Sequence, residues 1–293
     1  MIRISSLFLL LPLLAAGAFG QDPPPSNTVV TQPEGSEPIY HVNVVSRTTV
    51  AINYGHRTDP TKIDFHGTVL LPQAHGEATV QSKRGTVDID AKFERVDPPT
   101  KFGTGYLTYV LWAITPEGRP VNLGELVPNS SNKGKLHVST DLQSFALIVT
   151  AEPYYSVTQP SDVVVMENVL RPDTVGKVEQ VNARYELLPR KGFTFDPSAP
   201  VPGAASGEKL SMDQYEAVVA IYQAQNAIQI ARVAGADHYA PETFQKAQQL
   251  YRNAEYYRDK KADSKTIVMT AREAAQAAED ARAIAAKRQQ RTE

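Results

Sequence analysis

Residues 211–235 read SMDQYEAVVAIYQAQNAIQIARVAG, and residues 263–290 read DSKTIVMTAREAAQAAEDARAIAAKRQQ. In both stretches alanine and isoleucine recur at alternating spacings of three and four residues, which places them on one face of a helix. Alanine buries little apolar area, so a single helix of this kind would be marginal in water. Its small side chain instead lets two helix axes approach closely. These residues therefore predict helices that pack against one another.

Capping residues set the ends of the first predicted helix. Ser211 and Gln214 have the spacing of a capping box, in which the Ser211 hydroxyl accepts a hydrogen bond from the Gln214 amide. Gly235 suits the left-handed position just past a helix end. The predicted buried stripe of this helix consists of Ala217, Ile221, Ala224, Ile228 and Ala231.

Two further helices are predicted by similar signals. Pro241 suits the first position of a helix, because its missing N–H needs no partner there. Asp263 or Ser264 can cap a third helix. We expect an α-helical hairpin or a three-helix antiparallel bundle over residues 208–290, and not one long solvated helix. The predicted stripes consist of Phe244, Ala247, Tyr251, Ala254 and Tyr257 or Arg258 in the second helix and Ile267, Ala271, Ala274, Ala278, Ala281 and Ala285 in the third.

Three runs in this part of the chain carry a resemblance to a known family. They are APETFQKA at residues 240–247, YRNAE at residues 251–255 and AREAAQAAEDA at residues 271–281. Together they resemble an uncharacterised family of alanine-rich helical domains of Gram-negative envelope proteins, which often precede an OmpA-type peptidoglycan-binding domain. The resemblance covers about residues 211–290 and implies no catalytic residue. We expect no OmpA-type domain after this region, so the resemblance does not imply peptidoglycan binding.

The N-terminal residues are typical of an exported protein. Arg3 precedes the apolar run at residues 7–16, and residues 18–20 read AFG, a small-x-small cleavage signal. We therefore interpret residues 1–20 as a secretory signal peptide cleaved before Gln21; an uncleaved anchor is the alternative. The expected location is the periplasm or cell envelope of a Gram-negative bacterium.

Composition excludes several classes of function. The formal net charge is −2 and the chain contains no cysteine, which excludes disulfides, thiol catalysis and zinc–thiolate sites. Acidic and basic residues are interleaved, so we expect no nucleic-acid partner. Charges recur through residues 211–290, and no segment after the signal peptide is apolar enough to span a membrane.

Residues 39–188 show the alternation of β-strands. Val87, Ile89, Ala91 and Phe93 alternate with charged residues, and Ile63, Phe65, Val69 and Leu71 follow the same rule. Many short strands separated by turn signals predict an antiparallel Ig-like β-sandwich. A Pro-rich spacer precedes it at residues 21–38, and a Pro/Gly linker follows at residues 189–207. Further strands are expected near residues 40–53, 77–83, 106–115, 135–141, 145–151, 162–169 and 177–188.

One strand and its surroundings carry a second resemblance. Residues 106–114 are apolar on both faces, which predicts a central strand, and we interpret Trp112 as core and not as a ligand-stacking residue. YVLW at residues 109–112, PVNLGEL at 120–126, FALIVTAEP at 145–153 and QPS at 159–161 are similar to the extracytoplasmic sandwich domain of anti-sigma-K factors. The match, about residues 106–165, implies the fold. It does not imply sigma-factor regulation, since we expect neither the cytoplasmic segment nor the membrane helix of those factors here.

No motif of catalysis is present, so we expect no enzyme, cofactor or metal site. His56, His66 and His75, with Asp64, could meet across strands, but strand alternation favours solvated residues on an outer face. Asp88 and Asp90 supply too few oxygens for a calcium site.

Tyrosine supplies the candidate interaction residues. In the helices these either fill the core between alanine stripes or form a contact surface for a protein or a glycan. The candidates are Tyr222, Tyr239, Tyr251, Tyr256 and Tyr257 in the helical region and Tyr154 and Tyr155 in the strand region.

These observations favour an exported, non-enzymatic envelope protein that acts as an interaction or scaffolding module, with another envelope protein as its partner. The alternative is a carbohydrate- or peptidoglycan-binding module that uses Trp112, Tyr154 and Tyr155. A hydrolase with a site assembled from dispersed carboxylates and histidines is a third class. Self-association through the alanine stripes is a further expectation for the helical part.

Overall fold

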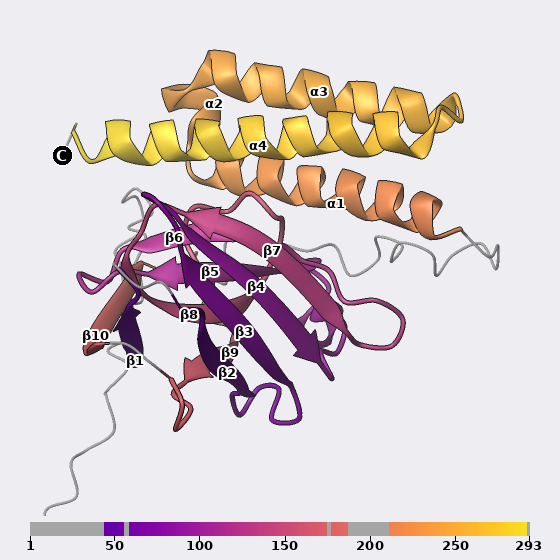
Figure 1. Ribbon diagram of the computed structural model, residues 1–293. Coiled ribbons are helices and arrows are strands. Elements are labelled where there is room, and N and C mark those ends of the chain that lie inside the picture. The colour runs from indigo at the N-terminus through magenta and orange to yellow at the C-terminus, as the bar shows by residue number, and fades with distance from the viewer. Residues whose placement is uncertain (1–43, 56–58, 175–176, 187–210, 292–293) are drawn as a thin grey trace, which may run out of the picture. The chain divides into compact units, whose positions relative to one another are not determined.

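The computed structural model describes residues 44–55, 59–174, 177–186 and 211–291 (Figure 1). The described strands and helices fall in a single unit, Val42–Glu293. The predicted signal peptide, spacer and linker lie outside the described residues. The strands are β1 (Val44–Asn53), β2 (Thr61–Gly67), β3 (His75–Ser82), β4 (Val87–Glu94), β5 (Thr108–Ile114), β6 (Pro120–Leu126), β7 (Gly134–Thr140), β8 (Ser144–Glu152), β9 (Val164–Val169) and β10 (Lys177–Glu186).

All pairings among the described strands are antiparallel. The strand order is β10-β1-β8-β9-β2-β3-β4-β7, and β5 pairs with both β6 and β8. The sheet curls so far that β6 approaches β7: a Cβ at Gly134 would lie only 2.5 Å from Leu126 Cδ1. A mostly antiparallel, nearly barrel-like sheet thus precedes the helices, as the sequence predicts for the order of β and α regions.

The predicted alternation is confirmed in β4 and only partly correct around β2. Val87, Ile89, Ala91 and Phe93 are all buried. The prediction for Val69 is wrong, because this side chain is 90% exposed. The strand ends at Gly67, whose amide donates to the Ala74 carbonyl at 2.9 Å, so Val69 lies in the turn that follows.

β5 is a central strand, as its double apolar face predicts. It is buried along its whole length and lies between β6 and β8. Tyr109 and Leu111 point into the core enclosed by the sheet. Val110 and Trp112 belong to a second apolar cluster, which includes the helices. The strand therefore needs apolar residues on both faces because each face is covered.

β6 was not predicted as a strand. Its residues are mostly half-buried and show no clear alternation. Its pairing with β5 shifts register between Leu111 and Trp112, and Gly124 has φ 151°, a conformation that favours glycine. The bulge interrupts the period-two pattern that would have identified the strand.

The helices begin and end close to the predicted residues. They are α1 (Met212–Val233), the short α2 (Ala236–Tyr239), α3 (Pro241–Asp259) and α4 (Ser264–Gln289). The Ser211–Gln214 capping box is formed, and Gly235 has a left-handed φ of 74°. Asp263 caps α4 by accepting from the Thr266 amide at 2.9 Å. Only α2, which lies between two predicted helices, was not expected.

α4 lies between α1 and α3 (Figure 1). α1 and α4 run in the same direction, and the Gln289 side-chain amide near the end of α4 donates to the Ala234 carbonyl near the end of α1 at 3.2 Å. α3 runs in the opposite direction (Figure 1). The predicted stripes of α1 and α4 are buried throughout. In α3, Phe244, Ala247 and Ala254 are buried, and Tyr251 and Tyr257 are half-buried.

Enlarging an alanine of the α4 stripe should destabilise the protein. Ala278 is fully buried, so Ala278→Leu forces side chains or helix axes apart, and we expect a loss of about 1–3 kcal/mol in the free energy of unfolding. Ala283→Leu, at an exposed position of the same helix, is the matched control and should have little effect. Urea denaturation checks both variants. Equal midpoints would contradict close packing at Ala278.

Candidate binding site between the sheet and the helices

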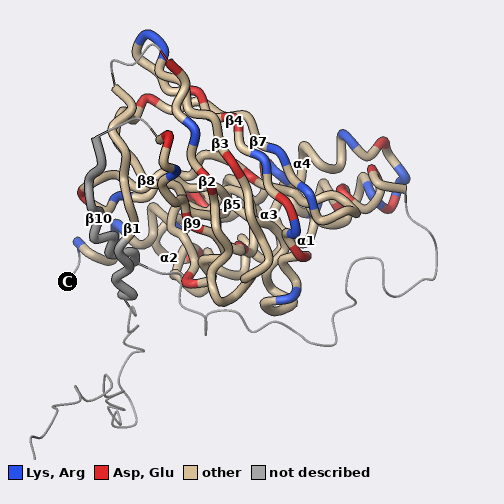
Figure 2. Tube along the Cα trace, turned by 60° about the horizontal axis from the view of Figure 1, so that its bottom comes forward, with Lys and Arg blue, Asp and Glu red and all other residues tan. Residues whose placement is uncertain are grey.

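The outer face of β5 and β8 and the inner face of the helices share one apolar cluster. Trp112, Ile114 and Ile148 from the strands lie in the same cluster as the alanine stripes of α1 and α4. The sequence predicts a strand region and a helical region joined by a linker at residues 189–207. It does not predict that the two regions share a core. Figures 1 and 2 show the helical layer beside the sheet from two directions.

A buried ion pair on α4 anchors this contact. Arg282 donates from Nε to Glu279 Oε2 at 2.7 Å and from Nη2 to Oε1 at 2.8 Å. Both residues are buried, at 1% exposure for Glu279 and 7% for Arg282. The Tyr154 hydroxyl and the Thr158 amide donate to the same carboxylate at 2.7 and 2.9 Å. The loop after β8 thus supplies the remaining hydrogen bonds to the Glu279 carboxylate on α4. A buried ion pair is stable only when such further hydrogen bonds are made.

The same loop contacts α1 and α4 at Tyr155. Its backbone amide donates to Gln223 Oε1 and its hydroxyl donates to the Arg272 carbonyl, both at 3.0 Å. The Arg272 guanidinium carbon lies 3.9 Å from the centre of the Tyr155 ring, within cation–π distance. The Asn226 side chain of α1 donates to the carbonyls of Gly105 and Pro153. Side chains of both helices therefore hold the loop in place.

A chain of polar groups also runs beneath the helices, on the face of β8 that carries Ile148. Trp112 donates from Nε1 to the Thr150 hydroxyl at 2.8 Å, and Thr150 donates to Glu152 Oε1. The Ser161 amide donates to the same oxygen at 2.7 Å, while Oε2 is buried with no hydrogen-bond partner among the described residues. Burial raises the pKa of Glu152 to about 8. This carboxyl therefore holds its proton at neutral pH.

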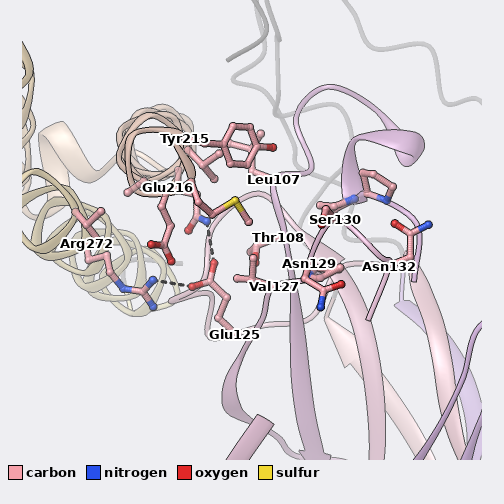
Figure 3. A pocket seen from close by; sticks show the side chains of 18 residues that line it. Leu107, Thr108, Glu125, Val127, Asn129, Ser130, Asn132, Tyr215, Glu216 and Arg272 are labelled. Carbon is pink, nitrogen blue, oxygen red and sulfur yellow. Dashed lines mark hydrogen bonds and ion pairs between the residues drawn. The ribbon is translucent and has the colours of Figure 1, made fainter. Parts of the chain in front are cut away.

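A pocket of about 660 Å³ opens at one end of this contact (Figure 3). Its walls come from the segment before β5, from β6 and the loop after it, and from the N-terminal halves of α1 and α4. Neither the strands nor the helices alone form it. The lining residues are Pro98, Pro99, Leu107, Thr108, Glu125, Val127, Pro128, Asn129, Ser130, Asn132, Met212, Tyr215, Glu216, Val219, Ala220, Gln223, Val268 and Arg272.

The pocket combines a fixed polar group with an apolar rim. Glu125 accepts from Arg272 Nη1 at 2.7 Å and from Gln223 Nε2 at 2.8 Å, so one β6 carboxylate binds both helices (Figure 3). Val127, Met212 and Tyr215 are 55%, 61% and 47% exposed. Exposed large apolar side chains that gather at a hollow are typical of binding sites.

The predicted tyrosines do not form one surface. Tyr154 is fully buried and Tyr155 half-buried, both engaged with α4. The Tyr251 hydroxyl donates to Glu255 at 3.0 Å. Tyr256 is exposed, and its ring lies 6.0 Å from that of the half-buried Tyr257. Tyr222 and Tyr239 are half-buried. None of these tyrosines lines the pocket, whose tyrosine is Tyr215.

The histidines and aspartates of the strands lie on solvated faces, as predicted. His66 and His75 are direct partners across β2 and β3 and both are exposed, while Asp64 pairs with Arg171 at 3.2 Å. No group of three potential metal ligands occurs among the described residues; His56 lies outside them. Asp88 accepts from the Ser139 hydroxyl and pairs with Lys83, and Asp90 pairs with His137 at 2.6 Å.

The sequence contained a signal for the helix–sheet contact that the alanine stripes obscured. Val268, Arg272, Ala275, Glu279 and Arg282 follow spacings of four and three, which makes a second stripe on α4. Arg272 and Glu279 contact the strand region, and Val268 lines the pocket. Charged residues that recur at helical spacing normally predict a solvent-exposed face. Only knowledge of their partners shows that such a face is buried.

No described helix is long and apolar enough to cross a membrane. Comparison of the chain with models of protein families, with curated proteins and with solved structures finds no match. Both family resemblances therefore stay predictions.

Breaking the buried ion pair should destabilise the protein strongly. Glu279→Gln leaves the Arg282 guanidinium buried without its counter-ion, and we expect a loss of about 3–5 kcal/mol in the free energy of unfolding. Glu273→Gln, at an exposed position of the same helix, should change it little. Guanidinium chloride denaturation measures both, and a Glu279→Gln variant as stable as this control would contradict the anchoring role.

Removing the buried carboxyl of Glu152 should alter the pH dependence of stability. The unfolded chain ionises this group above its ordinary pKa of 4.5, while the folded chain keeps the proton up to about pH 8. The contribution of Glu152 to the free energy of unfolding therefore falls as pH rises through this window. Relative to the natural chain, Glu152→Gln should gain on the order of 1 kcal/mol per pH unit across the window and level off above it.

Urea denaturation across this pH range tests the prediction for Glu152. Glu242→Gln, at an exposed position of α3, serves as the control and should follow the natural chain. A difference between Glu152→Gln and the natural chain that does not change with pH would show that the carboxyl is ionised in the folded state.

Proposed function

We propose that this protein is an exported, non-enzymatic module of the cell envelope that binds another envelope protein. The observation that supports this best is the gathering of Val127, Met212 and Tyr215, all exposed, around one pocket. Apolar side chains in a hollow favour binding, because a partner that covers them removes apolar area from water.

The way the helices dock supports a scaffolding role for the same site. The two walls of the pocket are joined by Glu125, Arg272 and Gln223 through side-chain hydrogen bonds. A partner therefore meets a preformed surface and spends little free energy on ordering it. For the fold, we propose that the strand region is an Ig-like sandwich and that the helical region is a three-helix bundle.

Binding of a glycan or of peptidoglycan through strand-region aromatics has less support. Trp112 and Tyr154 are fully buried, so neither ring offers a platform to a sugar. The Tyr155 ring packs beneath Arg272. We also propose export through residues 1–20 and an envelope location. Fractionation of the source cells tests both, because an exported chain is recovered with the envelope and not with the cytosol.

Photo-crosslinking in the source cells tests the proposed function. A benzoylphenylalanine at position 215 lies at the pocket rim, and we expect it to capture one recurrent protein from the envelope fraction, because the rim binds the partner. The same group at position 69, an exposed apolar position in the turn after β2, is the matched control and should not capture that protein. Recovery of the chain only from the cytosol, or the same products from both positions, would contradict the proposal.

A further inference from the structure

The pocket carries an acidic side chain that no described residue pairs with. Of its two lining carboxylates, Glu125 is held by Arg272 and Gln223. The carboxylate of Glu216, on α1, makes no ion pair or hydrogen bond with any described residue. With one arginine against two carboxylates, the lining has a net charge of −1. An occupant with a positive charge would balance it.

The position of Arg272 decides where that charge can lie. Its guanidinium donates to Glu125 Oε2 at 2.7 Å (Figure 3), and its carbon also lies 3.9 Å from the centre of the Tyr155 ring. Arg272 is therefore engaged by Glu125 and Tyr155, whereas Glu216, which extends from α1 on the Arg272 side in Figure 3, keeps a negative charge that can attract a cation. Tyr215 lines the same pocket from the other side of α1 and offers an aromatic ring to an occupant. The basic group of an occupant therefore belongs beside Glu216, on the wall that α1 forms.

The opposite wall offers hydrogen-bonding groups of the kind that bind a peptide backbone. Asn129 Oδ1 accepts from the amides of Ser131 and Lys133, so its NH₂ group remains to donate. The Asn132 side chain donates to Asp97, so its oxygen remains to accept. A peptide group presents one N–H and one C=O, which matches this pair of side chains.

The size and the rim limit the occupant further. A volume of about 660 Å³ holds a few side chains and not a folded domain. Val127 and Met212 would cover an apolar side chain next to the basic one. A neutral glycan could use the amides but would leave the Glu216 charge and this apolar rim without a matching group.

From these contacts we propose that the pocket binds a short, extended peptide segment of a partner protein, with a lysine or arginine at Glu216 and an apolar side chain against Val127 and Met212. The proposal rests on the proposed function, because it assigns the chemistry of the partner segment at the same site. It makes Glu216 the residue that determines specificity.

Fluorescence anisotropy with the full chain and three labelled hexapeptides tests this inference. The peptides share leucine at two positions and differ at one, which is lysine, glutamine or glutamate. We expect the lysine peptide to bind up to about fivefold more tightly than the glutamine peptide, which is the upper limit for one exposed ion pair, and the glutamate peptide to bind most weakly. High salt should reduce the preference for lysine.

Two variants locate the site. Glu216→Gln, at an exposed position of α1, should abolish the preference for lysine and keep binding of the glutamine peptide. Val127→Lys should weaken binding of all three peptides, because it places a cation in the apolar rim. Val69→Lys, an exposed control far from the pocket in sequence, should match the natural chain. Urea midpoints of all variants confirm that the fold is kept.

Either of two outcomes would overturn the inference: no peptide binds, whether or not a chito-oligosaccharide does, or the three peptides bind equally. Crosslinking from position 215 separates this result from the proposed function. A captured envelope protein without peptide selectivity would overturn only the peptide inference. Peptide selectivity without a captured protein would overturn only the proposed function.

Discussion

The helical layer depends on one buried interaction, the ion pair between Glu279 and Arg282. A buried carboxylate is tolerated only when its charge is paired and its oxygens accept hydrogen bonds. Arg282 supplies the charge from the same helix, and Tyr154 and Thr158 supply further donors from the loop after β8. Since these donors belong to the strand region, the charge on α4 is fully satisfied only when α4 lies against that loop.

This constraint places the rest of the contact. With α4 held at Glu279, Arg272 lies two turns earlier on the same stripe and reaches Glu125 of β6. Gln223 brings α1 to the same carboxylate. The apolar cluster around Trp112 is then covered by alanine stripes, which bring the helices close but give little directional preference. The polar contacts fix the position of the helices along the sheet. The pocket is the space that remains between α1, α4 and the loop after β6.

Local chemistry was enough to predict most elements. Ser211, Gly235 and Asp263 act at helix ends through contacts within a few residues, and the alternation of β4 reflects a strand with one wet face. Prediction failed where a local pattern was interrupted, as at the bulge of β6 and at Val69 after the early end of β2. Residue type alone indicates the candidate tyrosines, and it cannot distinguish the buried Tyr154 from the exposed Tyr256.

The sequence by itself determined the order of β and α regions, the helix caps and the alanine faces, because each depends on spacing within one segment. Only the tertiary structure decided that Glu279 and Arg282 are buried, that Trp112 lies under helices, and that Glu125 joins two of them. These facts depend on residues about 100 or more positions apart, such as Tyr154 and Glu279. The local sequence around a charged helix residue is the same whether water or a distant loop provides its hydrogen-bond partners. The sequence alone therefore cannot show which of the two is present.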